Sequence, residues 1–181
     1  MSTKVVTGKV RFSFCHVWEP QANPGQEPKY SVTLLIPKSD KATLDRIQAA
    51  ITEAADSYRQ RNGSASLPAR PNTTLHDGDG VRDSGDPYGP ECKGCMVITV
   101  SSKVAPVVVD RDRNPIIDTA EVYSGCYGRA AINFYGYNSN GKKGISAGLL
   151  SVQKLADGEP FGTVGSASDF DDDFQDDDGW M

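Results

Sequence analysis

The chain has 181 residues, of which 38% are hydrophobic and 24% charged, and its formal net charge is −5. This length suits one domain built around a single hydrophobic core. No apolar run approaches the roughly 20 residues of a membrane-spanning helix, and no apolar segment typical of a secretory signal lies near the N-terminus. Membrane and secreted proteins are therefore disfavoured, and we expect a cytoplasmic protein whose four cysteines are reduced thiols.

Charge is unevenly distributed along the chain. Residues 1–154 contain all 19 Lys and Arg and 15 of the 24 acidic residues, whereas residues 155–181 contain nine acidic residues and no basic one. A basic body with an acidic tail is typical of proteins that handle nucleic acids. The alternative is an acidic tail that only keeps an unrelated domain in solution.

Two strands and one helix are expected in the first third of the chain. Residues 29–37 alternate as a half-buried strand, and residues 39–61 predict a helix, because apolar residues recur there at spacings of three and four. Ser39 or Asp40 can cap this helix, and Gly63 ends it. Residues 5–18 also alternate, and the side that we expect to face the core carries Val10, Phe12, Phe14, His16 and Trp18.

The remaining elements are mostly strands. Residues 64–94 are poor in apolar side chains and predict one long loop. Residues 96–110 predict a strand interrupted at Pro106, which lacks the N–H that a ladder needs. Residues 121–138 predict a long strand that bends at its glycines, and residues 145–155 its antiparallel partner.

These elements predict a mainly β protein with an OB-fold-like Greek-key barrel and one helix. We expect the barrel domain to cover residues 1–155. Residues 156–181 have no periodic pattern, which indicates a flexible acidic tail. A generic antiparallel sheet covered by one helix would give nearly the same pattern of elements, so it stays open as the alternative.

The strand over residues 121–138 provides the candidate binding surface. One face is apolar, and the other carries four tyrosines and an arginine. Aromatic rings stack on unpaired bases for about 1–3 kcal/mol each, and basic groups follow the phosphates. The alternative for each tyrosine is packing beneath a loop or the helix. The candidate DNA contacts are Tyr123, Tyr127, Arg129, Asn133, Tyr135, Tyr137, Lys142 and Lys143, extended by Lys9, Arg11, Lys103, Arg111 and Arg113.

Signatures of enzymes and of metal sites are weak. Cys92-x-x-Cys95 has no second close pair of ligands, so small buried or loop thiols are favoured over a zinc site. A P-loop and an H-E-x-x-H motif are both absent. We expect no cofactor, no metal and no catalytic residue. The alternatives are an adaptor that works through its acidic tail, or a metal-dependent nuclease that uses the loop carboxylates Asp77, Asp79, Asp83 and Asp86.

Residues 123–130 (YSGCYGRA) and 140–150 (NGKKGISAGLL), together with SSKVAPVVVDRDRNPI upstream, closely resemble a phage and prophage family of single-stranded DNA-binding proteins, first catalogued as a domain of unknown function. The resemblance extends from the first strand to about Gly162. It implies an oligonucleotide-binding barrel that coats single-stranded DNA during phage replication and recombination, without enzymatic activity, in the cytoplasm of the infected bacterium.

The acidic segment DFDDDFQDDDGWM is similar to the tails through which such proteins recruit a polymerase, helicase or primase, although bacterial tails typically end on Phe rather than Trp-Met. As a coil, residues 156–181 would span roughly 28 Å, against a radius of gyration of roughly 15 Å for the body. The tail could therefore compete with DNA for the basic face, or reach a second copy, so a homodimer is compatible with the sequence but not indicated by it. The candidate partner-binding residues are Phe170, Asp171, Asp172, Asp173, Phe174, Asp176, Asp177, Asp178 and Trp180.

Overall fold

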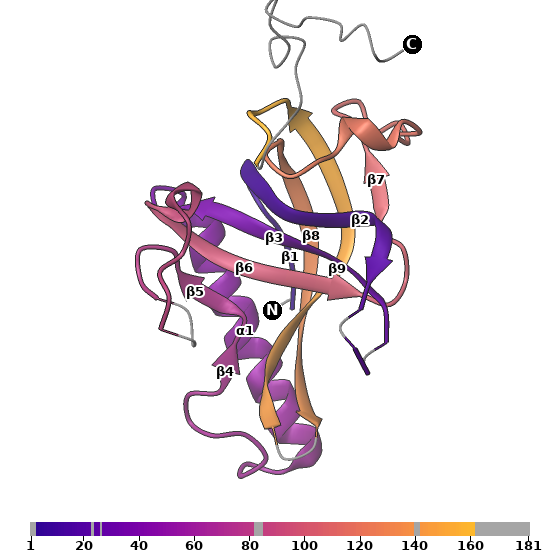
Figure 1. The fold of residues 1–181 in the computed structure, drawn as a ribbon. Helices are drawn as coiled ribbons and strands as arrows, with labels where there is room; N and C mark the ends of the chain where they lie inside the picture. Colours follow the sequence, from indigo (N-terminus) through magenta and orange to yellow (C-terminus); the bar gives the residue numbers. More distant parts are fainter. Residues whose placement is uncertain (1–2, 23, 26, 82–84, 140–141, 162–181) are drawn as a thin grey trace, which may run out of the picture.

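The computed structural model of the protein describes residues 3–22, 24–25, 27–81, 85–139 and 142–161. The tail residues proposed as partner contacts, 170–180, lie outside the described residues. One α-helix and nine strands make up the described part (Figure 1). No helix within these ranges is long and apolar enough to cross a membrane.

Five strands close into a barrel. Antiparallel pairs join β2 to β3, β3 to β6 and β8 to β9, while a parallel bridge joins β6 to β9 and an antiparallel pair between β8 and β2 completes the circle. The prediction of a mainly β, OB-like fold is confirmed. The five strands are β2 (Val10–Gln21), β3 (Lys29–Pro37), β6 (Cys95–Ser102), β8 (Tyr127–Ser139) and β9 (Lys142–Ala156).

Short elements fill the edges of the barrel. Residues 64–94, expected to form one loop, contain two short strands and a 3-10 turn, because Thr74 and its neighbours hydrogen-bond to β6 and β9. The predicted interruption at Pro106 is confirmed, since β6 ends before it and β7 begins after it. The short elements are β1 (Lys4–Val6), β4 (Asn72–Thr73), β5 (Leu75–Asp77), η1 (Pro90–Cys92), β7 (Val107–Val109) and η2 (Thr119–Glu121).

The predicted helix is confirmed as α1 (Lys41–Asn62), directly after β3. The Asp40 carboxylate caps it by accepting a hydrogen bond of 3.2 Å from the Thr43 N–H, and Gly63 follows its last residue with a φ of 101°. Its apolar stripe, which includes Ile47 and Ile51, is buried against the barrel and the β8–β9 hairpin. The hairpin extends beyond the barrel alongside α1 (Figure 1).

Strand β8 follows the predicted alternation but starts later than predicted. The apolar side chains assigned to the core are buried, from Val122 and Cys126 to Phe134. The strand begins at Tyr127 rather than near residue 121, because residues 119–121 form a 3-10 turn. Tyr123 therefore lies before the strand and not on its face.

Strand β2 departs from the predicted alternation at Phe14. Ser13 pairs with Thr33 and His16 pairs with Ser31, so β2 contains a bulge between them. The assignment of Phe14 to the core is wrong: its side chain is 57% exposed, and Val17 is buried instead. One extra residue in a strand reverses the side to which the following residues point.

Candidate nucleic-acid interface

The candidate contact residues lie in several places on the barrel rather than along one strip. At the start of β8, the Tyr127 ring lies beside two cations from the start of β2. The Lys9 Nζ atom is 5.0 Å from the ring centroid, and the Arg11 Cζ atom is 5.3 Å from it. These three side chains line a pocket of about 290 Å³. Glu91 also lines this pocket, beside the two cations. Two cations next to an aromatic ring suit an anionic, planar ligand.

Arg11 also contacts the last described residues of the chain, Glu159 and Phe161. Its Nη2 donates to the Glu159 carbonyl over 2.6 Å and its Nε to the Gly125 carbonyl over 2.9 Å. Its Cζ atom lies 4.2 Å from the centroid of the Phe161 ring. Phe161 packs against a second apolar cluster on the outside of the barrel, formed around Leu35 and Val97. Residues 157–161, which we call the strap, therefore cover part of the predicted basic face.

Tyr123 is hydrogen-bonded to the strap. Its hydroxyl donates to the Gly158 carbonyl over 2.9 Å and accepts from the Gly158 N–H over 3.2 Å. The nearly buried Lys154 side chain binds the carboxylates of Glu121 and Asp157 at 3.0 and 2.6 Å. No pattern in the sequence indicates the strap, because its partners Tyr123 and Arg11 lie far from it in the chain.

A second group of candidates lies on the β8–β9 hairpin. Tyr135, which is 44% exposed, and Tyr137 line a groove of about 550 Å³ together with Lys29 and His76. Each ring lies over a glycine of β9: a Cβ at Gly148 would be 3.5 Å from the Tyr135 ring, and a Cβ at Gly144 would be 3.2 Å from the Tyr137 ring. Glycines on the facing strand thus leave room for both rings.

Three lysines surround this second group. Lys142 and Lys143 are exposed at the start of β9. Lys103 pairs with Glu27 at 2.8 Å on the surface. The hydrogen bond that Lys103 donates to Glu27 raises the pKa of Lys103, and the nearby Tyr135 raises it further. An exposed pair of this kind contributes little to stability, so Lys103 can exchange its partner for a phosphate at small cost.

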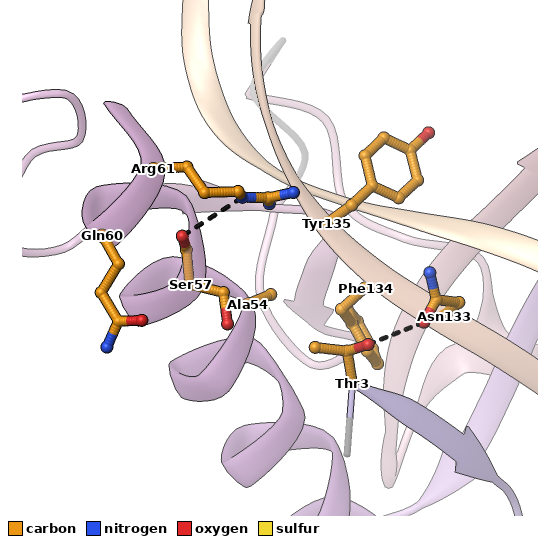
Figure 2. Close-up of a pocket in the computed structure, with 8 residues that line it drawn as sticks. All are labelled: Thr3, Ala54, Ser57, Gln60, Arg61, Asn133, Phe134 and Tyr135. Carbon is orange, nitrogen blue, oxygen red and sulfur yellow. Dashed lines mark hydrogen bonds between the residues drawn. The ribbon is translucent and has the colours of Figure 1, made fainter. Parts of the chain in front are cut away.

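Asn133 and Arg129 connect β8 to the N-terminal strand. The Arg129 Nε donates to the Thr7 carbonyl over 2.9 Å, and the Asn133 Oδ1 accepts from the Thr3 hydroxyl over 2.8 Å. Asn133 also lines a groove of about 450 Å³ between α1 and β8. Figure 2 shows this groove, with Arg61 reaching from α1 toward β8.

Arg111 and Arg113 lie in the turn after β7. The Arg111 side chain donates to the Leu155 carbonyl over 3.1 Å, while the Gln153 amide donates to the Asp110 and Arg111 carbonyls. Gln153 pairs with Arg129 of β8 on one side and with Val109 of β7 on the other. The structure therefore places the Arg111 turn across β9 from Arg129, on a different stretch of the hairpin from Tyr135 and Tyr137.

The residues considered for metal chemistry have other roles. Lys38 lies between Asp77 and Asp79, 2.7 Å from each, and its hydrogen bonds lower the pKa of both carboxyls. Burial, and then the neighbouring Cys126, raises the pKa of Cys15 to about 12. Asp83 lies outside the described residues. In the part of the chain that the structure describes, no three His, Cys, Asp or Glu side chains are grouped to hold a metal ion.

Comparison with known proteins identifies the family. The model of the family described as the Enterobacter phage Enc34 ssDNA-binding protein matches residues 3–180. The chain belongs to this family. It is 36% identical over 180 residues to protein p50 of Acyrthosiphon pisum secondary endosymbiont phage 1, with 93% of each chain covered. The predicted resemblance is confirmed.

Solved structures of the Enc34 family and beyond share the fold. The structure of the single-stranded DNA-binding protein of bacteriophage Enc34 in complex with ssDNA matches with a TM-score of 0.76 and 31% identity, covering 88% of this chain and 90% of that one. The single-stranded DNA-binding protein gp2.5 of bacteriophage T7 matches with a TM-score of 0.60 over 98% and 97% of the two chains, and at 16% identity this shows the fold alone. The Enc34 family model and the Enc34 structure are both those of single-stranded DNA-binding proteins.

Proposed function

We propose that this chain binds and protects single-stranded DNA, largely without sequence preference, during phage replication and recombination. The observation that carries the proposal is the groove beside the exposed Tyr135 ring. Tyr137 and Lys29 line this groove, and Lys103 lies near Tyr135. The Enc34 relative solved with ssDNA, at 31% identity, supports the same ligand.

The chemistry of this surface favours a single strand over a duplex. A ring can stack only on a base that is unpaired and turned outward, and every base has such a face, so stacking is tolerant of sequence. The lysines around the groove are suited to contacting phosphates, which carry no sequence information. We infer that Tyr127 with Lys9 and Arg11 forms a second part of the DNA path, and that Arg111, Arg113 and Arg129 extend it.

We further propose that the acidic tail competes with DNA and recruits replication proteins when DNA displaces it. Residues 162–181 contain seven aspartates and no basic residue. The strap supports this proposal, because Phe161 is stacked on Arg11 and so the tail starts beside a cation of the predicted basic face. A tail that starts at its binding surface has a high local concentration there.

The test is a fluorescence titration of labelled oligo-dT and of a duplex of equal length, at several salt concentrations, with the full chain and with residues 1–161. We expect salt-sensitive binding that favours the single strand and becomes tighter at low salt when residues 162–181 are absent. Binding to neither DNA by either protein would overturn the proposed function. Equal affinities of the two proteins at low salt would overturn competition by the tail alone.

A further inference from the structure

Phe14 is an exposed aromatic residue in an unfavourable backbone conformation. Its φ is 45°, in the left-handed region that bulky side chains rarely adopt, and its side chain is 57% exposed. Neither property helps the protein to fold, since burying the ring would remove apolar surface from water and a different residue would relieve the backbone. Unfavourable conformations of this kind concentrate at functional sites.

The bulge in β2 is what turns Phe14 outward. Cys15, the next residue, packs against the main core, and its N–H donates to the Ser124 hydroxyl over 2.9 Å. With Cys15 directed inward, the ring of Phe14 is presented on the outer face of the barrel. The bulge thus has a fixed partner in Ser124, and it places Phe14 next to Ser13 on that outer face.

The outer face beside Phe14 is a floor of small polar residues. Across the paired strands, Ser13 of β2 lies opposite Thr33 of β3, which lies opposite Thr99 of β6. The Thr33 and Thr99 hydroxyls are 3.1 Å apart. Ser13 and Thr33 are only 4% and 8% exposed although they face outward, so the floor is recessed below its larger neighbours.

The next row of the floor leads to Tyr135. His16 of β2 pairs with Ser31, Ser31 pairs with Ser101, and Ser101 pairs with Gly148 of β9. Tyr135 lies over that same Gly148. Neither row contains an Asp or Glu, so the floor has no carboxylate that would repel phosphates. Figure 1 shows β3 and β6, the two strands that carry the middle of both rows, side by side across the front of the barrel.

The spacing of the strands separates the two rings. Paired strands lie about 4.8 Å apart, so β2 and β9 are separated by roughly 14 Å across the floor. One base cannot touch rings on both sides of such a gap. Two bases of one extended strand can do so, with the intervening backbone lying over the hydroxyl floor.

We propose that Phe14 is a base-stacking residue and that single-stranded DNA crosses the outer face of β2, β3 and β6 between Phe14 and Tyr135. This inference rests on the proposed function and specifies the face of the barrel that binds DNA. The strain at Phe14 is the cost of presenting a ring on that face.

The test compares Phe14→Gly and Phe14→Leu with the parent chain and with Ile117→Ala. This control removes an apolar side chain of the loop after β7 that is 91% exposed, against 57% for Phe14. Loss of a stacked ring is expected to weaken oligo-dT binding by about 5- to 140-fold in both Phe14 variants. The salt slope should not change, because the ring is uncharged. Phe14→Gly should also keep or raise the Tm, since glycine adopts a φ of 45° without strain.

Three outcomes are decisive. Weaker binding by both variants, with an unchanged or higher Tm for Phe14→Gly and unchanged binding by Ile117→Ala, supports the inference. If the parent chain binds oligo-dT and Phe14→Leu binds it equally well, the inference is overturned and the proposed function stands. This holds even if Phe14→Gly folds poorly. A parent chain that does not bind oligo-dT overturns both.

Discussion

At the scale of single residues, the tyrosines of β8 differ in which side chains already contact their rings. Tyr127 lies within 5.0 Å of the Lys9 ammonium and within 5.3 Å of the Arg11 guanidinium. Tyr135 is 44% exposed and lies over a glycine. A ring that already contacts two cations has less free surface for a base, so Tyr135 is the better candidate for stacking.

Tyr135→Ala should therefore weaken binding to oligo-dT by about 1–3 kcal/mol. Tyr127→Ala should cost less, because Lys9 and Arg11 would remain available to phosphates. The measurement is a fluorescence titration of both variants at one salt concentration, with Tm values recorded in parallel. A larger loss for Tyr127→Ala, at equal Tm, would place the stacked base at the β2 end of the barrel.

The lysines at the hairpin should affect the salt dependence of DNA binding. Lys142 and Lys143 are exposed, and a lysine that contacts a phosphate of a single strand contributes about 0.7 to the slope of log K against log salt. Lys142→Ala and Lys143→Ala should each reduce that slope, whereas Tyr135→Ala should leave it unchanged. The comparison requires titrations at four or more salt concentrations. Slopes that stay equal to that of the parent would move the DNA away from the hairpin tip.

At the scale of elements, sequence alternation predicts much of the fold but not the bulge. Residues such as Ile132 and Phe134 are buried as the alternation of β8 requires, and the helix follows its apolar spacing and its Asp40 cap. The bulge at Phe14 has no glycine or proline to indicate it. Its partner Ser124 is distant in the chain, and only folding brings the two together.

The candidate site could be predicted from the sequence only in part. Strand periodicity groups the tyrosines of β8 on one face, but it does not show which basic residues have partners. Arg129 binds the Thr7 carbonyl, and Arg11 binds the Glu159 carbonyl and stacks on Phe161. These partners are separated from the arginines by more than a hundred residues, so no local pattern reveals them.

The β8–β9 hairpin packs against α1 at Gly136, where only glycine fits without a clash. A Cβ at Gly136 would lie 2.5 Å from the Tyr58 ring, which is closer than van der Waals contact allows. Gly136→Ala should lower the free energy of unfolding by about 1–3 kcal/mol through overpacking. Gly148→Ala is the matched control for stability, since its Cβ would meet no atom closer than 3.5 Å. Thermal unfolding of both variants checks this, and equal Tm values would show that Tyr58 moves aside freely.

At the scale of the whole molecule, the strap fastens the chain that follows β9 to the barrel. Lys154 binds Asp157, Tyr123 binds Gly158, Arg11 binds Glu159, and Phe161 packs against the outer apolar cluster. Gly125 permits this close approach, because a Cβ there would lie 2.3 Å from the Glu159 carbonyl oxygen. Seven aspartates follow the strap in the sequence, within residues 162–181.

A chain that ends at residue 161 should therefore be as stable as the full chain, while one that ends at residue 156 should not. Removing residues 157–161 exposes the apolar surface under Phe161 and leaves Lys154 with one carboxylate partner instead of two. A half-buried Phe contributes about 1–2 kcal/mol, and each kcal/mol shifts the Tm by about 2–4 °C at this size. Thermal unfolding of the two truncated chains and of Phe161→Ala in the full chain measures the difference. If the chain ending at residue 156 melts at the same temperature as the one ending at residue 161, the strap contributes nothing to the body, and the tail has no fixed starting point beside Arg11.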